Sequence, residues 1–261
     1  MISLLLIPFL TCVGLVMIHV FFGSFVLRRG IIFIDLALAQ WAALGYIVGV
    51  LFHVHHPNML YIMAFLFTVI AALILVILKD VYNRINLQEA VIGVMYITAT
   101  ALATGIISSY GMEGSHLHEM LTGHLLIVSI SELTTSLIIY SVVGALLFLF
   151  RSIWLQKEGG ALGNFIFYSL FGAVVTSSVK LVGVLLVFSY LVIPVLSTSL
   201  LFKETKWQIG GGWVFGLLGS IIGLSLSLVL DVPLSYLIIL SLVGLWIVSI
   251  VMSLFLFKKS N

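Results

Sequence analysis

The chain has 261 residues, of which 62% are hydrophobic and 8% are charged, and its mean hydropathy is +1.33. This composition excludes a soluble globular domain, in which about 25% of the residues are charged. The formal net charge is only +2, so the chain offers no basic surface suited to nucleic acid. The single cysteine, Cys12, has no partner for a disulfide within the chain and is expected to be a packing residue.

Nine apolar stretches, each long enough to cross a bilayer, occupy most of the sequence. They cover residues 2–27, 31–52, 59–78, 90–109, 133–150, 161–179, 181–202, 208–230 and 232–257. A bilayer core of about 30 Å requires about 20 apolar residues in a helix. The stretches are too long and too uniformly apolar for barrel strands. The sequence therefore predicts an all-α, polytopic membrane bundle of about nine spans, in one domain over residues 1–261. The alternative has eight spans, with residues 161–202 partly re-entrant.

Basic residues predict the orientation of the chain in the membrane. They occur in five pairs, which are Arg28 and Arg29, Lys79 and Arg84, Arg151 and Lys157, Lys203 and Lys206, and Lys258 and Lys259. Two spans separate each pair from the next, so all five pairs can lie on one face, and the positive-inside rule makes this face cytoplasmic. We expect the N-terminus outside and the C-terminus inside. Lys180 falls on the other face and is expected to snorkel from a helix end.

Four glycines in the eighth stretch predict close helix packing. Gly212, Gly216, Gly219 and Gly223 follow one another in steps of four, three and four residues, which places them on one helix face. Such a face lets another helix approach closely, either within the bundle or between subunits.

Six of the seven histidines fall in the two predicted outer loops. The candidates for attracting metal at an outer entrance are His53, His55, His56, His116, His118 and Glu119. Imidazole and carboxylate groups together suit Zn²⁺, Mn²⁺ or Fe²⁺. Their spacing matches no closed structural zinc motif, and the alternative is a polar loop whose histidines lie at the lipid headgroups.

Three polar residues interrupt the apolar stretches themselves: Asp35, Gln40 and His19. An ionisable group within a span suggests a transport path. The alternative for Asp35 is a helix cap or an ion pair with the nearby arginines, and the alternative for His19 is packing against a neighbouring helix. Glu89 begins the fourth stretch, where the helix dipole alone explains a carboxylate.

Enzyme motifs are absent from the sequence. No Gly-x-x-x-x-Gly-Lys-Ser/Thr segment occurs, so we expect no hydrolysis of ATP by this chain alone. No His-Glu-x-x-His segment or serine triad arrangement indicates an intramembrane hydrolase. The chain is therefore predicted not to be an enzyme.

Four ordered segments carry a resemblance to a known family. They are residues 26–45, which include Arg28-Arg-Gly30 and Phe33-Ile-Asp35, residues 89–93 (Glu-Ala-Val-Ile-Gly), residues 182–194 (Val-Gly-Val-Leu-Leu-Val to Pro194) and residues 230–233 (Leu-Asp-Val-Pro). Together they resemble the permease subunits of metal-ion ABC importers, the zinc, manganese and iron family with a dedicated extracytoplasmic binding protein. The resemblance runs from about residue 25 to residue 255.

This resemblance implies an importer for divalent transition metals in a prokaryotic plasma membrane. Two copies of the permease would line a central path, and a binding protein would dock outside near the histidine loops. A separate ATPase would dock inside at residues 151–164 and drive alternating access. The metal ion would be cargo, no cofactor would be tightly bound, and ATP would bind only to the partner.

The sequence departs from the family at the usual metal ligands in the second stretch. Leu36 takes the position of the family's aspartate, Gln40 takes that of its histidine, and Asp35 falls one residue early. One residue turns a helical side chain by about 100°. We therefore expect Asp35 and Gln40 to be the polar groups nearest the path, without a tight site. The alternative functions are an ion-coupled secondary transporter, which would need charged or unwound sites near the midplane, and a non-transporting membrane scaffold subunit.

Overall fold

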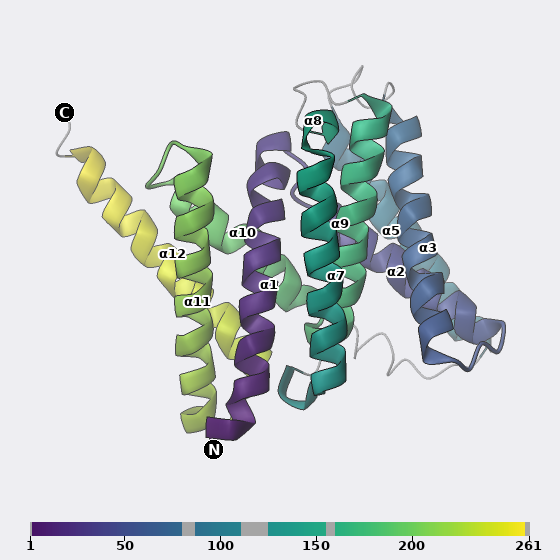
Figure 1. Ribbon diagram of the computed structural model, residues 1–261, viewed down its shortest axis with the longest axis horizontal. Helices are drawn as coiled ribbons and strands as arrows, with labels where there is room; N and C mark the ends of the chain where they lie inside the picture. The colour runs from purple at the N-terminus through teal and green to yellow at the C-terminus, as the bar shows by residue number, and fades with distance from the viewer. Residues whose placement is uncertain (1, 80–86, 111–124, 155–159, 259–261) are drawn as a thin grey trace. The chain divides into compact units, whose positions relative to one another are not determined.

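The computed structural model describes residues 2–79, 87–110, 125–154 and 160–258, and the regular elements within them are all helical (Figure 1). The elements are α1 (Ile2–Arg29), α2 (Ile34–Leu51), α3 (Pro57–Ile77), α5 (Gln88–Tyr110), η1 (Leu125–Ile127), α7 (Ile130–Leu149), α8 (Arg151–Trp154), α9 (Ala161–Val182), α10 (Val184–Ser199), α11 (Thr205–Leu230) and α12 (Leu234–Lys258). The prediction of an all-α membrane bundle is confirmed.

Helix α10 is the shortest of the helices that correspond to the nine predicted stretches. Eight helices among the described residues are long and apolar enough to cross a membrane, and α10 falls short with 16 residues. Its length is about 24 Å at 1.5 Å per residue, whereas a bilayer core is about 30 Å thick. The chain enters α10 from Gly183, which has a φ of 80°. By length and composition the count of full spans is therefore eight, and α10 is a ninth, shorter helix.

The helices form two compact units, which we describe separately. Unit 1 consists of the described parts of residues 1–29, 122–135 and 181–261, and unit 2 consists of those of residues 30–121 and 136–180. Each unit consists mainly of apolar helices. The single membrane domain expected over residues 1–261 stays a prediction.

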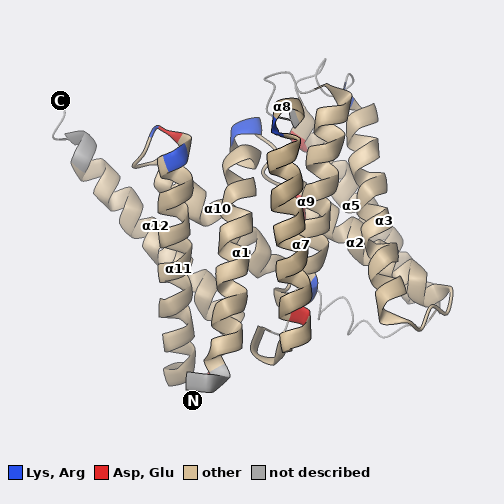
Figure 2. Ribbon diagram, in the orientation of Figure 1, with Lys and Arg blue, Asp and Glu red and all other residues tan. Residues whose placement is uncertain are grey.

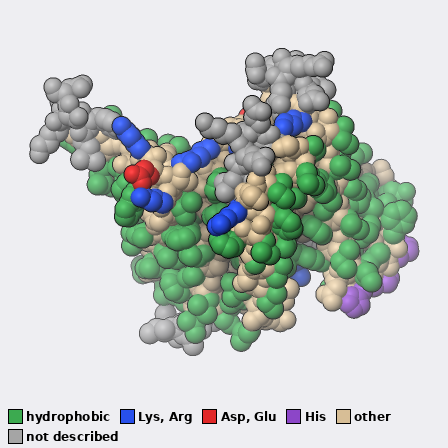
Figure 3. Space-filling view, turned by 45° about the horizontal axis from the view of Figure 1, so that its top comes forward, with side chains coloured by type: hydrophobic (Ala, Val, Ile, Leu, Met, Phe, Trp, Pro, Cys, Tyr) green, Lys and Arg blue, Asp and Glu red, His purple; other side chains and the backbone are tan. Residues whose placement is uncertain are grey.

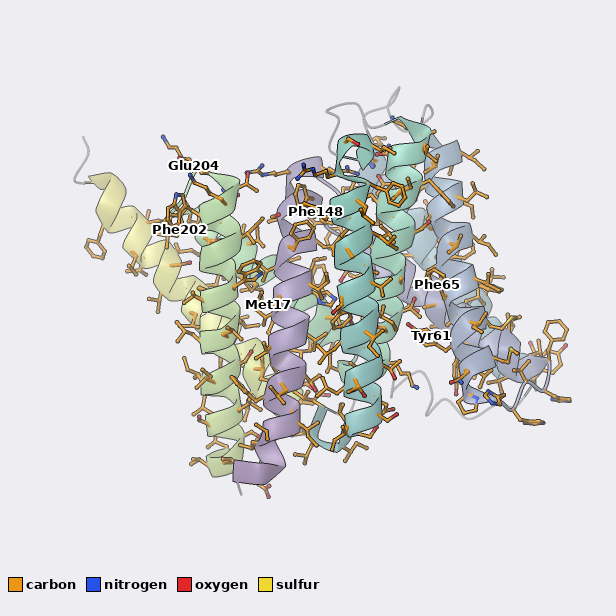
Figure 4. The ribbon with its side chains drawn as sticks, viewed as in Figure 1. Met17, Tyr61, Phe65, Phe148, Phe202 and Glu204 are labelled. Carbon is orange, nitrogen blue, oxygen red and sulfur yellow. The ribbon has the colours of Figure 1, made fainter. Side chains whose placement is uncertain are left out.

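The glycine face of α11 is the packing surface at the centre of unit 1. A Cβ built at Gly212 would lie 2.7 Å from Val20 Cγ1 in α1, and one built at Gly223 would lie 2.5 Å from Ile238 Cα in α12. Trp213 Nε1 also donates a hydrogen bond to the Met17 carbonyl oxygen at 3.1 Å (Figure 4). The predicted close approach is confirmed, and the helices that approach belong to this same chain.

The register of these contacts gives the helix directions within unit 1. Gly212 faces Val20 and Gly216 faces Val16, so α1 runs antiparallel to α11. Gly219 faces Leu242 and Gly223 faces Ile238, so α12 is also antiparallel to α11. Since α1 and α12 therefore run in the same direction, the N-terminal end of α1 and the C-terminal end of α12 lie at opposite ends of unit 1 (Figure 1).

Two hydroxyl contacts join α10 to α11 within unit 1. The hydroxyls of Tyr190 in α10 and Ser220 in α11 lie 2.6 Å apart, and Ser220 also donates to the Gly216 carbonyl oxygen at 2.7 Å. Thr198 donates to the Gln208 carbonyl oxygen at 3.0 Å and thereby joins the end of α10 to the start of α11. Cys12 is fully buried in α1, as its expected packing role requires.

Helix α2 lies between α3 and α5 in unit 2. A Cβ built at Gly49 would lie 2.8 Å from Leu60 Cδ2, and one at Gly45 would lie 2.5 Å from the Met63 carbonyl oxygen, so α2 and α3 are antiparallel. Trp41 Nε1 donates to the Met95 carbonyl oxygen at 3.2 Å. Beyond that bond, a buried cluster joins α2 to α5, which run parallel; its residues are Leu44, Ile47, Ala99 and Ala103. This central position leaves most of the α2 residues buried within unit 2.

Within each unit the described basic residues of the five pairs gather at one end (Figure 2). In unit 1 these are Arg28 and Arg29 at the end of α1, Lys203 and Lys206 at the start of α11, and Lys258 at the end of α12. Arg28 donates to Gln208 Oε1 at 3.4 Å. In unit 2, Lys79 follows α3 and Arg151 follows α7, whereas Lys180 lies near the opposite end, in the last turn of α9. Arg84, Lys157 and Lys259 lie outside the described residues. The charge pattern within each unit agrees with the predicted arrangement.

Candidate functional site

Helix α2 carries both polar path candidates into the interior of unit 2. Asp35 lies in its first turn with 1% of its surface exposed, and Gln40 follows with 6% exposed. Five residues along a helix correspond to a rotation of about 140°. The two side chains therefore leave α2 in different directions, and they do not form a ligand pair on one helix face.

Asp35 keeps a carboxylate oxygen without a hydrogen-bond donor. Its Oδ1 is buried and has no partner among the residues that the structure describes. The N-cap residue of α2 is Phe33, whose side chain makes no capping hydrogen bond. A buried polar atom without a partner costs about 1–3 kcal/mol, so its retention suggests a functional demand. The Asp35 carboxyl group also interacts with the backbone N–H groups of Asp35 and Leu36 at the start of α2, as the capping alternative requires, so both expected roles of Asp35 stay predictions.

Glu89 is a residue whose contacts the sequence did not reveal. It lies in the first turn of α5, and its Oε1 accepts a hydrogen bond from the backbone N–H of Ile32, just before α2. Its Oε2 is buried and has no partner within the described parts of the chain. The adjacent Gln88 donates to the Tyr168 hydroxyl at 3.4 Å. A long-range contact therefore accompanies the helix-dipole effect that the sequence suggested. The sequence did contain a sign that Glu89 has a specific role. The chain has only nine acidic residues, so a carboxylate at the start of an apolar stretch is unusual.

The described histidines of the predicted outer loops lie together in the turn between α2 and α3, and Figure 3 shows exposed histidine side chains as one patch. The rings of His53 and His55 are nearly parallel, with centroids 6.5 Å apart. His56 is the N-cap of α3, and its Nδ1 accepts a hydrogen bond from the Asn58 backbone N–H at 3.3 Å. Only Nε2 of His56 is thus left for a metal ion.

The second predicted group of entrance ligands is not placed by the structure. His116, His118 and Glu119 lie outside the described residues. Among the residues that are described, no group of three histidine, cysteine, aspartate or glutamate side chains could hold a metal ion. The entrance site therefore stays a prediction.

His19 is fully buried in α1 of unit 1. Its Nδ1 donates a hydrogen bond to the Leu15 carbonyl oxygen of the same helix at 2.9 Å, because a carbonyl can only accept. This bond places a ring proton on Nδ1 and is compatible with both expected roles of His19, packing and ligand, which stay predictions.

The predicted ATPase-docking segment is described only at its ends. Residues 155–159 lie outside the described part of the chain. At the start of α8, the Arg151 guanidinium carbon lies 4.7 Å from the centre of the Phe148 ring, near the end of α7 (Figure 4). This cation–π contact holds Arg151 at the helix end.

Comparisons with known proteins identify what this arrangement of helices resembles. The model of the ABC 3 transport family matches residues 1–156 and 160–253. The fold is similar to a chain of PsaBC from Streptococcus pneumoniae in complex with Fab, with a TM-score of 0.75 and 19% identity over 94% of this chain and 90% of that one. It is also similar to an inward-facing conformation of a putative metal-chelate type ABC transporter, with a TM-score of 0.64 and 20% identity over 94% and 84% of the two chains. A comparison with curated protein sequences finds no match.

Proposed function

The chain belongs to the ABC 3 transport family and is a multi-pass permease subunit of a prokaryotic ABC transporter, and we propose that it carries a divalent transition metal ion into the cell. The observation that carries the proposal is the buried Asp35, whose Oδ1 has no partner among the described residues. A carboxylate oxygen in an apolar span attracts a cation, and the space for water to compensate it is limited.

The chemistry of the path favours brief contact with the ion. Asp35 supplies a charged oxygen and Gln40 a neutral amide oxygen, and both are harder donors than imidazole. A tight tetrahedral site would slow release of the cargo. With Leu36 in place of a ligand, the second helix offers Zn²⁺, Mn²⁺ or Fe²⁺ a transient contact that suits passage.

A metal chelate is a second candidate cargo. Asp35 and Gln40 leave α2 in directions about 140° apart, and no group of three metal-binding side chains occurs in the described regions. A chelate brings its own ligands and needs fewer from the protein. Uptake of a radioactive ion, measured alone and with its chelator, would separate the two cargoes.

The membrane orientation that we propose has the N-terminus outside and the C-terminus in the cytoplasm. Apart from Lys180, the described basic residues gather at one end of each unit, and positive charge favours the cytoplasmic side. The binding protein would then dock outside, near the histidines that follow α2. The ATPase would dock inside, at residues 151–164, and a second copy of the permease would complete the path.

Cysteine labelling tests this orientation. In a Cys12→Ala background, single cysteines at positions 55 and 118 are expected to react with an impermeant maleimide in intact cells. Cysteines at positions 84 and 157 and at the C-terminus are expected to react only after the membrane is opened. Labelling of position 157 from outside would contradict the orientation.

Dependence on a partner ATPase tests the function. Because the sequence contains no nucleotide-binding motif, the purified chain is expected to hydrolyse no ATP. Metal uptake into proteoliposomes is expected only when a separate ATPase subunit and a binding protein are added. Replacement of residues 152–163 should weaken the association with the ATPase, while Glu204→Ala, an exposed change at the α11 start, should not.

The same experiment separates the alternative functions. A secondary transporter would take up metal without the ATPase and would depend on a coupling ion. A scaffold subunit would bind partners without any uptake. Uptake without an ATPase, or binding of the ATPase without uptake, would each contradict the proposal.

A further inference from the structure

The connection between α1 and α2 is held to unit 2 by a carboxylate from another helix. Gly30 has a φ of 65°, and a Cβ built on it would meet no described atom within 4 Å. Two residues later, the Ile32 backbone N–H donates to Glu89 Oε1 in the first turn of α5. A bend at an open glycine is thus followed directly by an anchor.

The Glu89 carboxylate provides a hydrogen-bond acceptor at the start of α2, where the N-cap residue itself provides none. The first N–H groups of a helix, and those just before it, have no partner within the helix. Phe33, the N-cap residue of α2, cannot supply a side-chain acceptor. Ile31, just before Ile32, is fully buried, and Phe33, just after it, has 51% of its surface exposed. Glu89 therefore supplies, from α5, a hydrogen-bond acceptor for the N–H of Ile32, the residue that precedes the N-cap of α2.

The bond also fixes α2 relative to α5 at one end. Farther along, the Trp41 indole donates to the Met95 carbonyl oxygen at 3.2 Å, and the buried cluster of Leu44, Ile47, Ala99 and Ala103 follows. Two polar contacts at different heights set both the rotation and the axial position of a helix. Asp35 comes three residues after Ile32 and six before Trp41. The Glu89 contact is therefore nearer to Asp35 in the sequence than the Trp41 contact is.

We propose that Glu89 is a positioning residue of the transport path, which holds the start of α2 and thereby the direction of Asp35. The expected effect of Glu89 on uptake rests on the proposed transport function. The hydrogen bond between Glu89 and Ile32 does not depend on that function. To hold the Ile32 N–H, the side chain at position 89 needs an acceptor oxygen at the position of Oε1 and does not need a negative charge. Glutamine, which keeps such an oxygen, should therefore replace Glu89 with little loss, and alanine should not.

Cysteine reactivity tests the position of α2 without any metal. The full transporter complex carries Cys12→Ala and Ile31→Cys, and its reaction with N-ethylmaleimide is timed in membranes. We expect slow labelling with Glu89 or Glu89→Gln, and labelling on the order of tenfold faster with Glu89→Ala, since tenfold corresponds to about 1.4 kcal/mol of local opening. A cysteine at Ala99, which is fully buried on α5, is the matched control and should stay unreactive in all three.

Metal uptake by the same variants tests the consequence. Uptake should fall with Glu89→Ala and stay within about twofold of the unmodified level with Glu89→Gln, a difference of about 0.4 kcal/mol. Equal damage by both changes would overturn the proposal, because it would assign the role to charge. Unchanged labelling of Ile31→Cys in Glu89→Ala, or exposure of Ala99→Cys as well, would also overturn it. Lack of uptake by the unmodified complex would count against the proposed function, while the labelling contrast would still decide whether Glu89 holds α2.

Discussion

Asp35→Asn is expected to lower metal uptake about tenfold, because the change removes the charge from a buried oxygen and leaves its shape. Loss of a charged contact worth about 1.5 kcal/mol corresponds to a tenfold change in affinity. Gln40→Ala should cause a smaller loss, since an amide oxygen is a neutral donor. Uptake of radioactive Mn²⁺, Zn²⁺ and Fe²⁺ in cells that lack other importers measures both effects.

Asp231→Asn is the matched control for this experiment. Asp231 is exposed, follows α11 and has a φ of 53°, a left-handed conformation that asparagine also adopts readily. The same chemical change outside the path should leave uptake unchanged. Full uptake by the Asp35→Asn, Gln40→Ala double variant would show that the ion does not use these residues.

The membrane helices were predictable because lipid imposes a simple rule on the backbone. A helix is the way for an isolated apolar segment to satisfy its own N–H and C=O groups, so the apolar runs mark the helices. The shortness of α10 was not predictable in the same way. The apolar run continues through Gly183, and composition does not show that the backbone leaves the helical conformation there with a φ of 80°.

Packing was predictable in kind but not in partner. The spacing of the four α11 glycines requires a close neighbour, yet it does not say that Val16 and Val20 of α1 meet one half and Ile238 and Leu242 of α12 the other. These pairings depend on how distant parts of the chain meet. Sequence spacing within one helix contains no information about that.

For the candidate site, too, the burial of residues was predictable and their contacts with distant parts of the chain were not. Polarity within apolar runs pointed to the burial of Asp35 and Gln40, because such groups are costly in lipid unless they face the protein interior. The Glu89 contact joins a side chain to a backbone N–H that is 57 residues away in sequence, and a backbone group leaves no mark in the sequence. His56 was interpreted as a metal candidate, while its Nδ1 caps α3. Pro57, at the first position of α3, was the available signal for a cap.

Gly23→Ala is expected to destabilise the protein by about 3 kcal/mol or more, through forced separation of α1 and α10. A Cβ at Gly23 would overlap the Leu191 carbonyl oxygen and lie 3.0 Å from the Leu191 carbonyl carbon. These are backbone atoms within α10, so no side-chain rotation can relieve the overlap. The change also removes a close Cα–H to carbonyl approach, a weak attraction that adds to the packing. The effect is measured as the temperature of unfolding in detergent, which is detected by the loss of monodisperse protein on heating.

Gly210→Ala provides the comparison for Gly23→Ala within the same unit. Gly210 lies inside α11, and a Cβ built there would meet no described atom within 4 Å. Alanine in a helix is favoured over glycine by about 1 kcal/mol, so this variant should unfold at the same or a higher temperature. Because both changes add one methyl group to a helix of unit 1, their difference isolates the contact between α1 and α10. Equal unfolding temperatures would mean that α1 and α10 do not approach as closely as Gly23 and Leu191 indicate, and would remove the main steric argument for glycine at that position.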